Sequence, residues 1–577
     1  MYYFKKEKLL HARNLKLLFL LLFTFVIANV YSQNLEQINS KNPLKINGGI
    51  SVNQILYFSN DTLSKRSPYT WVATGNLNFS LYGWNVPFSY TISNYNKSFQ
   101  QPFNQYSMHP TYKWITLHIG YCNMNFSPYT LSGHTFLGAG VELAPPGIFR
   151  FSAMYGRLQK AIAPDTSNSN VQPAYKRMGY GFKAGIIKAG NILEVALFKA
   201  YDDIGSLGPV TADSTLRPKE NLVLSVSGKA NIIKNLNITA EFAGSGYTND
   251  LTVGKTSAQR NIFTATGLLQ MYQSTSIYNA LKSGLTYALG KSSIGMGYER
   301  VEPGYVTLGS YYSNNDFENF TANGATSLFE GKANVSLNTG IQHDDLDNKK
   351  TSKTSRIVSA LNISYSVSQK LNLSGSYSNF NTYTHIKPVF ETINQLTPYD
   401  NLDTLDFTEL SQSVNFNVSY ALKSTPIKRQ NINLNVNYML ANDKQASKNA
   451  GSSFLNTNIS YSHILIPLNL SVTGAFNTSY NKMSQANSVT LGPTVSIGKM
   501  FFNKKLRPSL SVSENESYSN GKNINSALIT RLSTSYILMK KHNFSLSLVG
   551  ADRSSKNTGT TSKLNEFTGT LGYSYNF

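Results

Sequence analysis

Charged side chains are scarce in this sequence, and cysteine is almost absent. Only 14% of the 577 residues are charged, against about 25% in typical soluble domains. The single cysteine, Cys122, excludes an internal disulfide framework and a zinc ribbon. Acidic residues are fewer than basic ones, with 30 Asp and Glu against 52 Lys and Arg. Together with 12% aromatic residues, this composition argues against a disordered chain, a coiled coil and an ordinary cytosolic enzyme.

A second absence is that of any long apolar run beyond the N-terminus. The one such run, Leu17 to Val30, follows five basic residues and is shorter than the ~20 residues that a membrane-spanning helix needs. Val30 and Ser32 complete the pattern of a secretory signal peptide, with predicted cleavage after Ser32. An uncleaved anchor helix is the alternative. We therefore predict a signal peptide at 1–32 and one domain at 33–577, because no linker divides the latter.

What the chain has instead is alternation of apolar and polar residues. The period is two in many tracts, for example in the apolar rows Val414, Phe416, Val418, Tyr420, Leu422 and Ile432, Leu434, Val436, Tyr438, Leu440. The intervening residues are mostly Asn, Ser, Thr and Gly, which suits strands with one face on lipid and the other on a watery lumen. Short turn-like breaks at 234–235 and 503–504 alternate with longer polar breaks at 344–353 and 388–406.

This layout predicts an all-β fold, a transmembrane antiparallel up-and-down β-barrel of the outer-membrane type. A strand and its share of turns take roughly 22 residues, so we expect about 24 strands, with a range of about 22 to 26. Outer-membrane lipid is then one partner of the chain.

The last residues of the sequence carry closely spaced aromatic side chains. Tyr573, Tyr575 and Phe577 share one strand face, with Ser574 and Asn576 on the other. This pattern resembles the C-terminal signal strand of bacterial outer-membrane proteins, which implies recognition by the barrel-insertion machinery. The alternative is the final strand of a secreted soluble β-protein.

A barrel of this width needs something to narrow its lumen, because about 16 to 18 strands already leave an aqueous channel. Two irregular segments with apolar residues are candidates: 99–110 together with 123–133, and 249–276. We expect one or both to fold into the lumen. The alternative is an extracellular loop with a small core of its own.

Charged residues inside the strand tracts are candidates for the lumen or its constriction. They are Glu142, Arg150, Arg157, Arg177, Lys183, Glu299 and Arg300. Glu299 with Arg300, and Glu142 with Arg150, are candidate ion pairs of the lumen, and turn-stabilising pairs are the alternative. Without residues 1–32, 47 Lys and Arg outnumber 29 Asp and Glu, giving +18. Most basic residues lie at turns, which favours the rim of the barrel over the lumen. No nucleic-acid partner is expected behind a signal peptide.

Motifs for chemistry are lacking. His109, His118 and His134, with Cys122 nearby, match no metal-ligand spacing, and the acidic run at 344–347 matches no EF-hand. No Gly-x-Ser-x-Gly elbow frames a nucleophile. We therefore expect no catalytic residue, metal or cofactor, and a protein that is not an enzyme.

Two passages have a distinctive composition, 127–157 and 297–309. Both resemble passages of large, poorly characterised outer-membrane β-barrel proteins of the Bacteroidota. The resemblance implies a Gram-negative outer-membrane location and a polar cluster that faces the lumen.

The function that the sequence predicts is transport across the outer membrane, as a porin-like channel or as the conduit of an export or uptake assembly. The alternative is a non-conducting structural or partner-binding barrel of a surface secretion or gliding machine, with a secretion or surface protein as its partner. The sequence leaves this choice open.

Overall fold

The computed structural model describes most of the chain after residue 43. The described residues are 44–60, 66–94, 103–164, 173–207, 216–256, 261–349, 355–379, 412–441, 444–445, 448–449, 452–483, 487–557 and 560–577. The predicted signal peptide, residues 99–102 of the first candidate lumen segment and the polar break at 388–406 lie outside them. Among the described residues, no helix is long and apolar enough to cross a membrane.

Strands make up nearly all of the described structure. The first half of the chain holds β1 (Leu44–Ser59), β2 (Tyr69–Leu81), β3 (Trp84–Ser93), β4 (Gln105–Met108), β5 (Thr111–Tyr112), β6 (Ile115–Asn123), β7 (Thr135–Leu143), β8 (Phe149–Gln159), β9 (Lys176–Lys188), β10 (Asn191–Asp203), β11 (Glu220–Ile233), β12 (Leu236–Thr248), β13 (Thr275–Leu289) and β14 (Ser292–Val301). The second half holds β15 (Phe317–Leu328), β16 (Ala333–Asp344), β17 (Ser355–Ser366), β18 (Leu371–Ser378), β19 (Gln412–Ser424), β20 (Lys428–Ala441), β21 (Lys444–Gln445), β22 (Lys448–Asn449), β23 (Ser452–Leu465), β24 (Leu470–Lys482), β25 (Asn487–Lys499), β26 (Ser509–Ser519), β27 (Lys522–Leu538), β28 (His542–Asn557) and β29 (Thr560–Asn576). Three short helical turns are η2 (Ile204–Ser206), α2 (Ile262–Ala265) and η3 (Phe329–Gly331).

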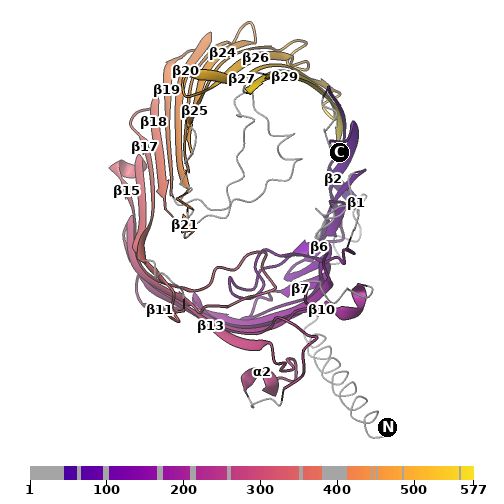
Figure 1. Cartoon of the computed structure of the whole chain (residues 1–577), viewed down its shortest axis with the longest axis vertical. Helices are drawn as coiled ribbons and strands as arrows, with labels where there is room; N and C mark the ends of the chain where they lie inside the picture. The colour runs from indigo at the N-terminus through magenta and orange to yellow at the C-terminus, as the bar shows by residue number, and fades with distance from the viewer. Residues whose placement is uncertain are drawn as a thin grey trace.

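The described strands form one closed antiparallel barrel, seen as a ring in Figure 1. Each strand pairs with its neighbour in the chain, and β1 pairs with β29 from Gly49 opposite Asn576 to Ser59 opposite Glu566, which closes the sheet. Of the 27 strands in this sheet, β4 and β5 occupy one position between β3 and β6, so the barrel has 26 strands. The predicted fold class is confirmed, and the strand number lies at the upper end of the predicted range.

Alternation along the strands gives the barrel an apolar outside and a polar inside. The row of Val414, Phe416, Tyr420 and Leu422 is exposed on the outer face of β19. The register continues this row into β20, where Ile432 lies opposite Tyr420 and Leu434 lies opposite Val418. At the closing pair, Val52 lies opposite Tyr573 and Ile50 lies opposite Tyr575, so the C-terminal aromatic residues also face outward. An apolar outer wall around a polar interior is the architecture of a transmembrane β-barrel.

The two ends of the barrel differ in their connections. Leu44 and Asn576 lie at one end, where most connections are tight turns such as 82–83, 189–190 and 234–235. Several turn residues there have positive φ, for example Asn235 at 71°, as tight hairpins require. The longer connections lie at the other end, so the predicted division into short turns and long loops is confirmed.

The apolar part of the second candidate lumen segment, described at 249–256 and 261–276, packs on the outside of the barrel. Its α2 (Ile262–Ala265) stands outside the ring in Figure 1. Phe263 and Leu269 pack on Leu197 and Leu222, which belong to the outward rows of β10 and β11 that also contain the exposed Val195 and Val226. The expectation that this segment enters the lumen is therefore wrong, because its apolar side chains cover the apolar outer wall instead.

Candidate functional site

Two connections from the end opposite the termini fold back inside the barrel and form what we call the inner layer, residues 124–134 and 302–316. They follow β6 and β14 and lie within the ring beside β6 and β7 in Figure 1. The two connections are tied to each other: Ser132 donates its N–H to the Gly309 carbonyl at 2.9 Å, and the Thr307 hydroxyl donates to the Thr130 carbonyl at 2.6 Å. The first candidate lumen segment is thus correct only in part. Residues 124–133 lie in the lumen, but 105–108 of the same candidate form β4 in the barrel wall between β3 and β6, and 302–316 was not predicted.

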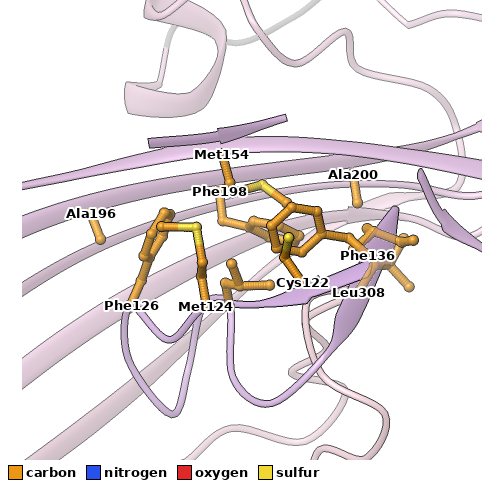
Figure 2. Close-up of a cluster of buried hydrophobic side chains, with 11 residues drawn as sticks. Cys122, Met124, Phe126, Phe136, Met154, Ala196, Phe198, Ala200 and Leu308 are labelled. Atoms are coloured by element: carbon orange, nitrogen blue, oxygen red, sulfur yellow. The ribbon is translucent and has the colours of Figure 1, made fainter. Parts of the chain in front are cut away.

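The inner layer packs on the barrel wall through a buried apolar core. Figure 2 shows Met124 and Phe126 pointing from the layer toward Met154 and Phe198 of the wall. The core also contains Cys122, Leu131, Phe136, Leu158, Ala196, Ala200 and Leu308. Its wall residues alternate with exposed outward residues such as Tyr155, so this core lies on the lumen side. An apolar core of this kind holds the layer in place as the core of a soluble domain holds its elements.

Close approach of the layer to the wall requires small residues at two positions. A Cβ atom at Gly140 of β7 would lie 2.3 Å from the Met124 sulfur, and one at Gly181 of β9 would lie 2.9 Å from the Phe126 ring. Both distances are shorter than real Cβ contacts, so a side chain at either glycine would push the layer away from the wall. Glycines on the inner face of β7 and β9 thus make room for the layer.

A buried asparagine joins the second connection to the wall. Asn221, at the start of β11, has no exposed surface. Its side-chain amide donates to the Val306 carbonyl at 3.3 Å, and its side-chain oxygen accepts the Leu308 N–H at 3.1 Å. The Ser245 hydroxyl of β12 also donates to the Val306 carbonyl, at 2.6 Å. Asn221 thus supplies the acceptor for the buried Leu308 N–H and shares the Val306 carbonyl with Ser245.

Charged residues of the inner wall surround the inner layer. Lys183 of β9 lies 3.7 Å from Glu194 of β10 and 3.5 Å from the Phe126 carbonyl of the layer. Lys282 of β13 lies 3.5 Å from Glu299 of β14, which also accepts a hydrogen bond of 2.6 Å from the Tyr129 hydroxyl of the layer.

The Tyr129 side chain makes both a polar contact, with Glu299, and an apolar contact, with Tyr305. Its ring packs against Tyr305 at 6.1 Å, edge to face. Burial raises the pKa of the Tyr129 phenol far above its usual range, and the nearby Glu299 carboxylate acts in the same direction. The phenol stays protonated at any physiological pH and remains a hydrogen-bond donor to Glu299.

Five of the predicted lumen residues lie on the inner face, but their partners differ from those expected. Lys183 and Glu299 contact the inner layer as described. Arg177 forms a two-pronged pair with Asp202 of β10, at 2.7 and 3.0 Å. Glu142 lies 3.8 Å from His118. Arg150 is bound to the carbonyls of Pro145, Gly147 and Phe149 at the turn before β8, and so stabilises that turn.

Two of the predicted residues, Arg157 and Arg300, face outward, and the lumen assignment for them is wrong. Arg157 lies opposite Leu137 in the row that contains the exposed Tyr155, and it donates to the Tyr121 hydroxyl at 3.3 Å. Arg300 lies opposite the exposed Leu281 and pairs with Glu318 at 3.3 Å. The physical reason is parity, because successive residues of a strand point to opposite faces.

The same parity corrects the two predicted ion pairs. Glu299 and Arg300 are neighbours on one strand, so they lie on opposite sides of the wall. Glu142 interacts with His118, and Arg150 with turn carbonyls. Neither pair of residues is in contact as an ion pair within the described structure.

The histidines have structural partners. The Nδ1 atoms of His109 and His118 lie 2.9 Å apart. The His134 ring stacks on the ring of Tyr311 in the inner layer, with 4.2 Å between the ring centroids. In the part of the chain that the structure describes, no group of three or more His, Cys, Asp or Glu residues could hold a metal ion. Asp347 of the acidic loop pairs with Lys349 at 3.0 Å.

Several residues of the site escaped the reasoning from sequence. They are Asp202, Glu194, Asn221, Glu241 and Lys282, which all lie on the inner face. Parity against an apolar neighbour could have found them, because Phe242 is outward and Glu241 next to it must then be inward. The partner of Asn221 lies in a distant loop, and nothing local in the sequence indicates that contact.

No protein-family model and no curated protein matches this sequence. Among solved structures, the chain is similar to the P pilus usher (PapC) translocation pore, with 10% identity and a TM-score of 0.41 over 92% of this chain and 100% of that chain. It is also similar to the ferric citrate transporter FecA in the unliganded form, with 9% identity and a TM-score of 0.37 over 92% of this chain and 79% of that one. An anion-selective porin from Comamonas acidovorans matches at 10% identity and a TM-score of 0.28, over 62% of this chain and 100% of that chain. These likenesses extend to the general barrel shape and no further.

Replacing Asn221 by alanine should loosen the second connection from the wall. The buried Leu308 N–H would lose its acceptor, while the Val306 carbonyl would keep only the Ser245 hydroxyl as donor, which costs about 2 to 3 kcal/mol. We expect hydrogen exchange of the Leu308 amide to become roughly 30- to 150-fold faster. The matched control is N417A, on the inner face of β19, which should leave that amide unchanged. Equal exchange in N221A and the unaltered protein would contradict this role.

Acid pH should weaken docking of the inner layer through His134. Burial lowers the pKa of His134 to about 4, and the Arg177 guanidinium acts in the same direction. A solvated His134 has a pKa near 6.5. Between about pH 4 and 6.5, His134 is therefore protonated when the layer is undocked and neutral when the layer is docked. Docking is thus at full strength above about pH 6.5 and weakens as the pH falls toward 4, by about 2 kcal/mol at pH 5.

Buried Cys122 provides the reporter for this effect. Its labelling by dithiodipyridine, measured relative to an H134F variant at each pH, should accelerate between pH 7.5 and 5. H134F keeps the ring on Tyr311 but cannot be protonated, so it serves as the matched reference. A constant ratio across this range would refute the titration of His134 as the cause.

Proposed function

We propose that this protein mediates transport across the outer membrane, with the inner layer as the constriction of its pore. The observation that carries the proposal is a wide polar lumen narrowed on one side by a layer with its own packed core. A loop that merely covered the barrel from outside would need no buried core on the inner wall.

The rest of the described inner wall suits the passage of polar solutes. Small uncharged residues line it along β16 to β19, where Asn362, Ser374, Ser376, Asn415 and Asn417 border a cavity of about 720 Å³. Such side chains offer donors and acceptors to water and solute without a strong fixed charge. Three ion pairs lie near the inner layer: Lys183 with Glu194, Lys282 with Glu299 and Arg177 with Asp202. Glu241 on the same inner face, opposite Lys282, adds a carboxylate that forms no ion pair within the described part of the chain.

This balance predicts a pore without strong ion selectivity. The purified protein in planar bilayers should conduct, with a reversal potential near zero in a salt gradient, because most of the inner-wall charges near the layer belong to ion pairs. A strongly anion-selective pore would contradict this arrangement, since it would require unpaired basic residues in the lumen. A folded barrel that never conducts would favour the second candidate function, a structural or partner-binding barrel.

We further propose that the C-terminal aromatic residues are read by the barrel-insertion machinery. Tyr573 and Tyr575 lie on the outer face of β29, and the Phe577 N–H is bonded to the Gly48 carbonyl of β1 at 2.9 Å. These residues therefore sit at the strand that closes the barrel.

A Y575A/F577A variant should reach the outer membrane poorly while still refolding in detergent. The readout is the fraction of heat-modifiable protein in isolated outer membranes, for a chain whose predicted mature N-terminus is Gln33. The matched control is F567A, which removes an exposed aromatic residue from the same face of the same strand. If both variants inserted to the same extent, the proposal that the insertion machinery recognises Tyr575 and Phe577 would be refuted.

A further inference from the structure

At the end of the barrel where Leu44 and Asn576 lie, the connections between strands carry almost exclusively positive charge. Basic residues lie in or beside nearly all of its connections: Lys113, Lys188, Lys234, Lys291, Lys332, Lys370, Lys428, Arg429, Lys499, Lys504, Lys505, Arg507, Lys540 and Lys541. Among the described connections at this end, the only acidic residue is Glu330. The described connections at this end are therefore strongly basic, in line with the expectation that most basic residues lie at the rim.

The charge is densest where two connections meet, at a group that we call the basic patch: Lys499, Lys504, Lys505, Arg507, Lys540 and Lys541. The connection 500–508 is fixed against β27, because the Ile537 N–H donates to the Lys505 carbonyl and the Arg507 N–H donates to the Ser535 carbonyl, both at 2.9 Å. Since β27 leads directly into 539–541, the two connections are neighbours. In the described structure, no carboxylate lies within ion-pair distance of the patch.

Exposed apolar side chains accompany the basic patch. Phe502 is 69% exposed and Met539 is 75% exposed, and Phe501 is exposed as well. Phe501 pairs with Leu506, which in turn pairs with Tyr536 of the outward row of β27. The Lys499 ammonium lies 5.1 Å from the Phe501 ring. Phe501, Leu506 and Lys499 are thus together on the outer side of the wall, whereas Lys505 and Arg507, which flank the outward Leu506, point to the opposite side.

The backbone that presents these groups has an unusual conformation. Phe502, Asn503 and Lys504 all have positive φ, at 51°, 54° and 66°. Successive left-handed residues other than glycine are unfavourable, and a bulky residue such as Phe502 seldom adopts this conformation. This backbone conformation places the exposed Phe502 next to Lys504 in the same turn.

We propose that the basic patch binds the headgroup of an anionic glycerophospholipid in the leaflet that faces the termini. The phosphate is held by Lys499, Lys504 and Lys540, while the acyl chains lie along Phe501 and the outward row of β27. Positive charge beside apolar groups, at the level where the outer wall leaves the hydrocarbon, matches a lipid, which offers both a phosphate and an apolar chain. An acidic periplasmic protein would match the charge but would leave Phe501 and Phe502 without a partner.

The test compares phosphatidylglycerol with phosphatidylcholine. The purified protein is placed in mixed detergent micelles, and bound lipid is counted by native mass spectrometry as the two lipids are titrated. Each lysine near an anionic surface strengthens association roughly five-fold. We therefore expect a clear preference for phosphatidylglycerol that falls with added salt, and a loss of at least roughly ten-fold in the K499Q/K504Q/K540Q/K541Q variant.

A matched variant distinguishes lipid binding by the basic patch from attraction by the overall positive charge at this end of the barrel. K188Q/K234Q/K291Q/K332Q removes the same four charges from other exposed turns at the same end and should retain the preference. F502S, which keeps every charge, should weaken binding of both lipids. Heat-modifiable migration verifies that each variant is folded.

Two results would overturn the proposal. Equal losses in the two four-lysine variants would show that the patch is not a distinct site. Absence of any phosphatidylglycerol preference in the unaltered protein at low salt would leave an acidic protein as the partner of the charge, and lipid binding at this patch would be abandoned.

Discussion

Every backbone N–H and C=O group that crosses hydrocarbon must find a partner on a neighbouring strand, and the rest of this structure depends on that constraint. The chain meets it by pairing each strand with the next and β1 with β29. Closure by 26 strands has a consequence, because a sheet of this size encloses a lumen that strand side chains alone do not fill. The inner layer fills part of this lumen on the side of β6 to β14.

The inner layer is held by the same forces as a soluble core, placed on the inside of a membrane barrel. Apolar side chains of 124–134 fill space that Gly140 and Gly181 leave open, and Asn221 satisfies buried backbone groups of 302–316. Because both connections also bond to each other, they form one unit. Charged residues of the wall beside the inner layer, such as Lys183, Glu194, Lys282 and Glu299, are engaged with this unit or with each other. Basic residues lie in most of the connections at the end of the barrel where Leu44 and Asn576 lie.

Period two was enough to predict the barrel, its outward rows and its short turns, because it depends only on the alternation of neighbouring side chains. The same alternation places Arg157 and Arg300 outside the lumen, because Arg157 shares the face of the exposed Tyr155 and Arg300 directly follows the inward Glu299. The lumen assignment considered only their position within strand tracts. Segment 249–276 was recognised as amphipathic, but an apolar segment can cover either an apolar core or an apolar outer wall. Segment 302–316 was missed because its partners, Asn221 and Thr130, are distant in sequence.

Single-channel conductance tests most directly whether the inner layer constricts the pore. One variant replaces 303–311 with a Gly-Ser linker. The matched control replaces 261–270, which packs on the outer wall through Phe263 and Leu269. If the inner layer narrows the lumen, the first variant conducts more than the unaltered protein and the second conducts the same. An unchanged conductance in the first variant, or an equal rise in both, would contradict the assignment of the layer as the constriction.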